Sequence, residues 1–259
     1  MTDLVTACAD QLEQAVKARS PIGRLTEEHP GLTLEQGYLV QQECTRRRVA
    51  AGDRVIGAKL GLTARAKQVQ MKVGEPVYGT LFASGIHPSE EPFRSEEFIN
   101  PRVEPEIVFR LGRALCGPGV HAADVIAATE SVCCGLEVID SRYRDFSFTA
   151  ADVVADNTSA ARVVLGPRMV DPARLDLRLL GLVLESDGAF VASATGAETV
   201  GHPAEAVAML ANWLGERSQA LEAGSLIFSG GLTAAAPLPA GTSVTATFAH
   251  LGSVTVRAV

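Results

Sequence analysis

Residues 101–109, Pro-Arg-Val-Glu-Pro-Glu-Ile-Val-Phe, constrain the fold more than any other stretch of the chain. Apolar and polar residues alternate along them, which predicts a β-strand. Glu104 and Glu106 are two positions apart, so both side chains point to one face with Cα atoms roughly 7 Å apart. Two like charges on a half-buried face require either water or a bound cation. Pro105 lacks a backbone N–H, which indicates an edge strand or an irregular one.

A third carboxylate strengthens the cation interpretation. Residues 131–139 form an apolar run typical of a buried strand, and Glu137 is the only charged residue in it. A buried carboxylate is costly unless it is paired or bound to a metal ion. Three carboxylates with no Cys or His beside them make a hard, oxygen-rich set. That set favours Mg²⁺ or Mn²⁺ over Zn²⁺.

The composition fits an enzyme with a substantial core. The chain has 259 residues, 47% of them hydrophobic, which is enough for one large domain or for a domain with a small appendage. Its net charge of −7, without a basic cluster, argues against a nucleic-acid partner. No apolar run is long enough to span a membrane, and the acidic Asp3 lies where a signal peptide would be basic. Five cysteines, two of them adjacent, fit a reducing compartment, so we expect a cytoplasmic protein.

Helices are expected early in the chain and strands late, which predicts an α+β fold rather than alternating βαβ units. Thr33 and Gln36 have the spacing of a capping box and open a helix that runs to about residue 51. A polar, loop-like stretch from residue 86 to 100 marks a soft boundary. We therefore expect a mainly helical region at 1–85 and a β-rich region at 86–259. Further segments expected from the pattern are helices at 4–17, 63–72, 122–129 and 203–217, and strands at 54–62, 161–165, 180–185, 189–193, 226–228, 243–249 and 253–258.

Two local features allow either a structural or a functional interpretation. Lys59 is the only charge inside the expected strand 54–62. Its side chain either extends to the surface or is a partly buried amine with a lowered pKa, suited to proton transfer. Gly230 and Gly231 follow a short apolar strand. They allow the backbone to approach a ligand closely, or they simply form a tight turn.

Several motifs occur together in the order typical of a known family. They are Gly-Ala-Lys-Leu-Gly-Leu-Thr at 57–63, Val-Glu-Pro-Glu-Ile at 103–107, Leu-Glu-Val-Ile-Asp-Ser-Arg at 136–142, Ala-Asp-Asn at 155–157, Gly-His-Pro at 201–203 and Leu-Gly-Ser-Val at 251–254. With them the chain resembles the hydratase/decarboxylase branch of the fumarylacetoacetate hydrolase superfamily over nearly its whole length. The resemblance implies a small helical N-terminal part and a larger C-terminal mixed β-roll.

Three positions favour the decarboxylases of that branch over the hydratases. Val77 stands where the hydratases typically have an aspartate, and Asp140 stands where they tend to lack an acid. The run Ser-Gly-Gly-Leu-Thr-Ala-Ala at 229–235 is similar to the decarboxylase version. The expected reaction is metal-dependent conversion of 2-oxo-3-hexenedioate to 2-hydroxypenta-2,4-dienoate and CO₂. Such a reaction belongs to the meta-cleavage degradation of aromatic compounds.

The resemblance also implies functional residues and partners. Mg²⁺ or Mn²⁺ is expected at Glu104, Glu106 and Glu137, and Lys59 is the expected catalytic residue. Arg142 is assigned to the distal carboxylate of the substrate on its charge alone. A homo-oligomer and a complex with the sister 2-oxopent-4-enoate hydratase are expected. The full set of expected substrate-binding residues is Leu62, Thr63, Gln68, Val77, Arg142, Asn157, Ser159, Gly230, Gly231 and Thr233.

Three other functions compete with decarboxylation. The chain is alternatively a hydratase that adds water to the dienol. It is alternatively an acylpyruvate hydrolase, which often uses a His–Glu pair near the metal, with His87 or His121 as the candidates to approach the carboxylates. The last alternative is a catalytically silent partner subunit of a hydratase. The intact lysine and glutamate residues argue against that role.

Overall fold

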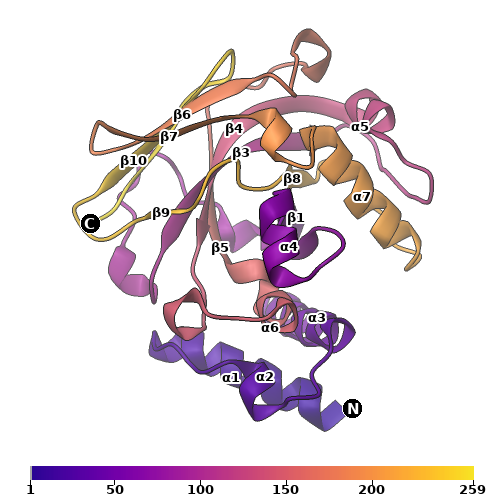
Figure 1. Cartoon of the computed structure of the whole chain (residues 1–259), viewed down its shortest axis with the longest axis vertical. Coiled ribbons are helices and arrows are strands. Elements are labelled where there is room, and N and C mark those ends of the chain that lie inside the picture. Colours follow the sequence, from indigo (N-terminus) through magenta and orange to yellow (C-terminus); the bar gives the residue numbers. More distant parts are fainter. Residues whose placement is uncertain (1) are drawn as a thin grey trace.

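The computed structural model describes residues 2–259, and its N-terminal helices form a separate layer below the sheets (Figure 1). The predicted capping box is confirmed, because Thr33 Oγ1 accepts from the Gln36 N–H and the Gln36 side chain accepts from the Thr33 N–H. Apolar side chains from all four helices of the layer form their own buried cluster. The helices of this layer are α1 (Thr2–Ala18), α2 (Leu25–Glu28), α3 (Leu34–Ala50) and α6 (Ala150–Ala155).

Helix α6 was not predicted from the sequence. It is only six residues long, and its residues are almost all apolar, so it lacks a helical period. Asp152 explains its position. The carboxylate accepts hydrogen bonds from the Thr149 N–H and hydroxyl at the start of α6, and from the Thr26 N–H and hydroxyl on α2. One buried acid therefore joins the N-terminal layer to a helix from the middle of the chain.

The main sheet has the strand order β2-β1-β8-β3-β4-β5, and the short β9 extends it beside β3. Pairing is antiparallel except between β1 and β8. The sheet consists of β1 (Val55–Gly61), β2 (Val77–Phe82), β3 (Arg102–Leu111), β4 (Thr129–Ile139), β5 (Ala160–Leu165), β8 (Leu226–Phe228) and β9 (Ala236–Pro237).

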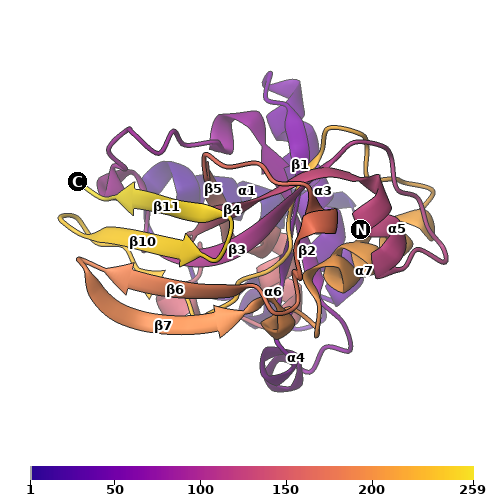
Figure 2. The ribbon, with the colours of Figure 1, turned by 90° about the horizontal axis from the view of Figure 1, so that it is seen from above.

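A second, four-stranded sheet lies against the main one, with the order β11-β10-β6-β7 (Figure 2). Apolar side chains of both sheets and of two helices form the large core of the molecule. The hairpin predicted at Asp187-Gly188 is confirmed between β6 and β7. These elements are β6 (Gly181–Ser186), β7 (Ala189–Thr195), β10 (Ser243–Phe248), β11 (Gly252–Arg257), α5 (Ala122–Ala128) and α7 (Pro203–Gly215); α4 (Arg65–Met71) connects β1 to β2.

The strand that carries Glu104 and Glu106 is not an edge strand, which corrects one of the two expectations drawn from Pro105. β3 lies inside the sheet, paired with β4 over its whole length. On its other side the pairing is interrupted between β8, which ends opposite Val108, and β9, which pairs with Val103. The Pro105 carbonyl faces this gap and accepts from the Leu232 N–H at 3.0 Å. Pro105, which has no backbone N–H, therefore lies in an irregular part of the sheet.

The α+β organisation, with helices first and a curled sheet after them, is confirmed. The division at residue 85 stays a prediction; β1 and β2 precede it in sequence and lie in the same sheet as β3 and β4. Within residues 2–259, no helix combines the length and the apolar character needed to cross a lipid bilayer.

Candidate active site

Three carboxylates converge where β3 and β4 pair. Glu104 lies directly opposite Glu137 in the strand register, and Glu106 lies opposite Gly135. One carboxylate oxygen of each glutamate lies within 4.8 Å of the other two. Glu106 and Glu137 are completely buried, whereas Glu104 is partly exposed to an adjoining cavity. The strand spacing and the pairing together bring the three predicted metal ligands to one point.

The carboxylate cluster has the properties of a divalent-cation site. Among the described residues, Glu106 Oε1 and Glu137 Oε1 are buried without a hydrogen-bond partner. Burial, reinforced by the Glu137 charge, raises the pKa of Glu106 well above its ordinary value. Burial likewise raises the pKa of Glu137 to about 7. A hard cation would satisfy the free oxygens and favour the ionised carboxylates, and an all-oxygen donor set suits Mg²⁺ or Mn²⁺.

Lys59 reaches this cluster from β1. Its Nζ lies 3.0 Å from Glu137 Oε2 and donates to the Thr158 carbonyl at 3.0 Å. The side chain is 2% exposed, so it does not extend to the surface. The predicted lowering of its pKa is also wrong. Burial alone would lower the pKa of Lys59, but the carboxylates of Glu137, Glu104 and Glu106 outweigh burial and raise it, so the residue is an ammonium ion.

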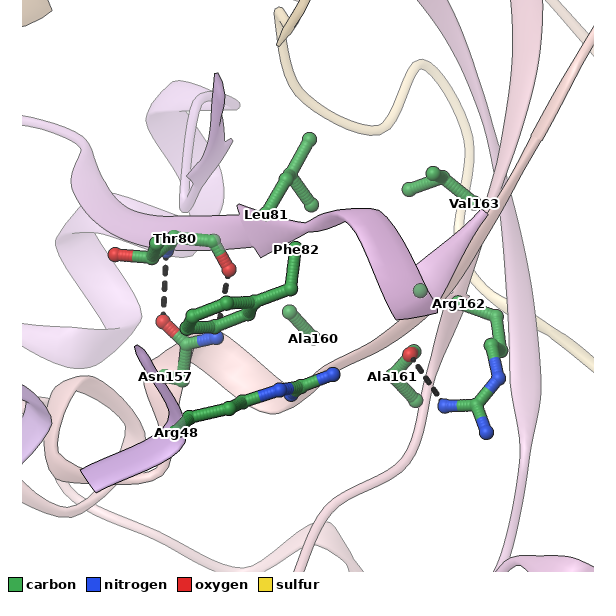
Figure 3. Close-up of a pocket in the computed structure, with 10 residues that line it drawn as sticks. Arg48, Thr80, Leu81, Phe82, Asn157, Ala160, Ala161, Arg162 and Val163 are labelled. Atoms are coloured by element: carbon green, nitrogen blue, oxygen red, sulfur yellow. Dashed lines mark hydrogen bonds between the residues drawn. The ribbon is translucent and has the colours of Figure 1, made fainter. Parts of the chain in front are cut away.

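A tight turn at Asn157–Ser159 provides the carbonyl that Lys59 binds. All three residues have positive φ, between 49° and 60°. Gly79 on β2 makes room for the turn, because a Cβ there would lie 2.1 Å from Thr158 Oγ1. Figure 3 shows the Asn157 amide paired with the backbone of Thr80: Oδ1 accepts from the N–H at 2.7 Å and Nδ2 donates to the carbonyl at 2.9 Å. Asn157 thus fixes the turn to β2.

A cavity of about 550 Å³ opens beside the carboxylates. Four charged side chains line it, which are those of Glu104, Lys59, Lys67 and Arg102. Lys67 Nζ lies 3.4 Å from Glu104 Oε1. The rest of the wall is largely apolar and includes Met71, Val77, Ile139, Phe146, Phe148 and Val153. The cavity therefore combines charged side chains with a largely apolar wall.

Several of the expected substrate-binding residues lie at this cavity. A Cβ on Gly231 would approach the carboxylate carbon of Glu104 at 2.9 Å, so only glycine leaves space next to that ligand. The Gly230 N–H donates to Glu106 Oε2 at 2.7 Å and holds it in position. The expected residues that line the cavity are Leu62, Thr63, Val77, Ser159 and Gly231.

The structure does not bring Gln68, Arg142, Asn157, Gly230 or Thr233 to the cavity wall. Arg142 is buried and donates through Nε to Asp156 Oδ1 and through a terminal nitrogen to the Asp156 carbonyl. Gln68 accepts from Arg65 at 3.3 Å, and the Thr233 hydroxyl donates to the Ala234 carbonyl at 3.0 Å. The assignment of Arg142 to the distal carboxylate of a substrate is therefore not supported by its position.

Several residues that line the cavity were not identified from the sequence, among them Arg102, Lys67 and Phe146. Arg102 lies two positions before Glu104, so the alternation of the strand already placed both side chains on one face. Lys67 carries no comparable signal, because its approach to Glu104 depends on how α4 packs. Phe146 has a left-handed backbone with φ of 53° in a short turn, and no periodic pattern predicts it.

The histidines lie elsewhere. His87 Nε2 contacts the Glu91 carbonyl at 3.0 Å, and His121 precedes the first turn of α5. None of the five histidines of the chain, all of them within the described residues, is among the residues that line the cavity. A His–Glu pair of the kind used by acylpyruvate hydrolases is therefore not formed at this cavity.

Comparison with curated proteins finds similarity over nearly the whole chain, although no family model matches it. The chain is 43% identical to 4-oxalocrotonate decarboxylase of Pseudomonas sp. (strain CF600), over 98% of this chain and 97% of that protein. It is 36% identical to 2-hydroxyhexa-2,4-dienoate hydratase of Comamonas testosteroni, over 95% of this chain and 94% of that one.

The comparison with solved structures also finds a decarboxylase with high similarity to this chain. The structure of 4-oxalocrotonate decarboxylase from Pseudomonas putida G7, complexed with magnesium and adipate, matches with a TM-score of 0.97 and 41% identity, covering 100% of this chain and 98% of that one. A more distant hydrolase structure, at 19% identity and a TM-score of 0.61, is similar in fold alone.

Proposed function

The chain belongs to the hydratase/decarboxylase branch of the fumarylacetoacetate hydrolase superfamily, and we propose that it is the Mg²⁺-dependent carboxy-lyase that converts 2-oxo-3-hexenedioate to 2-hydroxypenta-2,4-dienoate and CO₂. One observation carries the proposal. Three carboxylates, two of them completely buried with unsatisfied oxygens, converge beside a buried ammonium ion at the end of a cavity. Such a site stabilises negative charge that develops on a bound substrate.

The substrate explains why positive charge is needed there. It is a vinylogous β-keto acid, so loss of its C6 carboxylate as CO₂ sends an electron pair through C5 to C2 and onto the C2 oxygen. Glu104, Glu106 and Glu137 would hold a divalent cation, which would supply positive charge for the C1 carboxylate and the C2 oxygen. Lys59, kept protonated by the surrounding carboxylates, adds a second positive charge at the same end of the cavity. After CO₂ has left, the same ammonium group can donate the proton that the C2 oxygen of the dienolate takes up to give the dienol product.

The apolar part of the cavity favours cleavage of the bond between C5 and the C6 carboxylate. Val77, Phe146 and Phe148 provide few partners for water. A carboxylate depends on hydration more than the charge-dispersed transition state does, so a dry environment favours loss of CO₂. Val77 also cannot accept a proton, whereas hydration of the diene needs an acid or base to handle water. These features favour decarboxylation over the hydratase alternative.

Polar groups near the charged end are suited to the oxo acid of the substrate. Ser159 Oγ is buried, lines the cavity and has no hydrogen-bond partner among the described residues. Thr63 and Leu62 lie at the same cavity, and the absence of a side chain at Gly231 leaves room beside Glu104. We assign the binding of the C1 and C2 oxygens to this group of residues.

The proposed partners follow from the reaction. The dienol product is the substrate of the sister hydratase, and hydratases are similar to this chain over nearly its full length. We propose a homo-oligomer that associates with such a hydratase in the cytoplasm, where its five free cysteines would stay reduced. Size-exclusion chromatography of each protein and of the mixture tests this; independent elution at micromolar concentration would contradict it.

Turnover of the purified chain tests the function. With 2-oxo-3-hexenedioate and Mg²⁺, ultraviolet absorbance should report loss of substrate while released CO₂ is measured in parallel. The same preparation should scarcely hydrate 2-hydroxypenta-2,4-dienoate. If it hydrates the dienol faster than it decarboxylates the diacid, the hydratase alternative is correct, and no turnover of either compound would support a silent partner subunit.

A further inference from the structure

We propose that Arg102 binds the second carboxylate of the substrate and so determines selectivity for a diacid. This inference rests on the proposed function, since it assumes a substrate with carboxylates at both ends. The cavity is lined by three cations, and two of them have acidic partners: Lys59 pairs with Glu137 and Lys67 with Glu104. Arg102 makes no ion pair with any carboxylate in residues 2–259. It is therefore the cation left available for an anionic ligand.

The position of Arg102 matches the length of the substrate. It lies two residues before Glu104 on β3, so its side chain leaves the same face of the strand with its Cα roughly 7 Å from that of Glu104. Five carbon–carbon bonds of about 1.5 Å in extended form separate the carboxyl carbons of a six-carbon diacid by roughly 6 Å. A substrate with its C1 end at the carboxylate cluster can thus place its C6 end near Arg102.

Phe146 holds the guanidinium group in place. Arg102 Cζ lies 4.0 Å from the centroid of the Phe146 ring, and both residues line the cavity. A guanidinium stacked on an aromatic ring is immobilised in one plane, while the N–H groups at its edge stay free. Those N–H groups have the geometry to bind a carboxylate through two parallel hydrogen bonds.

Arg142, to which the sequence assigned this role, already binds Asp156. Arg142 donates to Asp156 through its side chain and its backbone N–H, and it lies outside the cavity wall. Lys67 is nearer to the metal ligands and presents a point charge without the planar donor pair. The role of distal-carboxylate contact therefore passes from Arg142 to Arg102.

The chemistry predicts how Arg102 affects the kinetics. The C6 carboxylate is charged in the bound substrate but becomes neutral CO₂, so its attraction to Arg102 weakens as the bond breaks. An interaction that is stronger in the ground state than in the transition state lowers KM and does not assist the chemical step, so its loss should raise KM without lowering kcat. Arg102 is thus a specificity-determining residue, in contrast to Lys59, whose charge acts on the developing enolate.

The test compares Arg102→Met with Arg110→Met in the Mg²⁺-loaded protein. Arg110 lies on the same strand but is exposed and faces Glu130 at 3.5 Å, outside the cavity, so its loss is a matched control. For Arg102→Met we expect KM for the diacid to rise about tenfold or more, the effect of losing a charged hydrogen-bonded contact, with kcat within about threefold of the wild type. Arg102→Lys should recover part of the loss, and Arg110→Met should change neither constant.

Binding measurements separate this inference from the proposed function. Calorimetry with adipate and with pentanoate requires no turnover. The wild type should bind adipate more tightly than pentanoate, and Arg102→Met should lose that preference. A preference that survives in Arg102→Met and Arg102→Lys, in variants shown to be folded by thermal unfolding, would overturn the role of Arg102 whether or not the chain releases CO₂. Loss of the preference in Lys67→Met instead would assign the contact to Lys67.

Discussion

Replacing Arg142 by methionine should destabilise the folded chain in a pH-dependent way and leave KM for the diacid nearly unchanged. The Arg142 and Asp156 side chains are 9% and 1% exposed and bind each other away from the cavity. Methionine keeps an unbranched apolar chain but removes the charge. Burial raises the pKa of Asp156 to about 6 even though Arg142 opposes that shift. Without the guanidinium, only the backbone N–H of residue 142 still opposes the effect of burial, so the pKa rises further and the folded variant keeps a proton on Asp156.

The size of the effect follows from that proton. In the wild type, Asp156 loses its proton as the pH rises through about 6. The variant retains it, and the unfolded chains of both proteins titrate alike. Holding a proton on a group of that pKa costs about 0.4 kcal/mol at pH 6, about 1.4 kcal/mol at pH 7 and about 2.7 kcal/mol at pH 8. The stability difference between wild type and variant should therefore widen as the pH rises above 6. Below pH 6 it should settle at a constant value, because the variant lacks the hydrogen bond from the Arg142 side chain to the Asp156 carbonyl at every pH.

Urea unfolding followed by circular dichroism at pH 6, 7 and 8 measures this difference. The double variant Arg142→Met with Asp156→Asn is the control, because asparagine does not titrate and the pH dependence should disappear. A stability loss that is the same at all three pH values would refute the reasoning about Asp156. A large rise in KM without any loss of stability would show instead that Arg142 contacts the substrate.

Three further substitutions test the candidate active site. Glu106→Gln should abolish Mg²⁺ binding in calorimetry without lowering the unfolding temperature of the metal-free protein, because a buried like-charge repulsion is removed. In the wild type, a chelator should stop turnover, and added Mg²⁺ or Mn²⁺ should restore it. Full activity in excess chelator would contradict the metal site. Lys59→Ala should lower kcat by about 10²-fold or more, and a wild-type kcat in a folded variant would rule out its catalytic role. Val77→Asp should slow CO₂ release in initial-rate assays, since it adds negative charge beside the leaving carboxylate, and an unchanged rate would show that Val77 is only packing.

Features that depend on neighbours along the chain could be predicted from the sequence. The alternation at residues 101–109 placed Glu104 and Glu106 on one face, and the apolar run around Glu137 identified a carboxylate that needed a counter-charge. The capping box at Thr33 was equally local. These inferences succeeded because side-chain direction in a strand and the first turn of a helix depend on residues only two or three positions away.

The sequence by itself thus determined which residue types were available for a metal-dependent lyase, and only the tertiary structure decided how they combine. The pairing of β3 with β4 set Glu137 opposite Glu104, which no local pattern specifies. The folded environment reversed the expected pKa shift of Lys59, because three carboxylates surround it. It also paired Arg142 with Asp156 and left Arg102 beside the cavity without an acidic partner among the described residues. Charge and burial are sums over atoms that are close in space, so contacts between distant parts of the chain fix them.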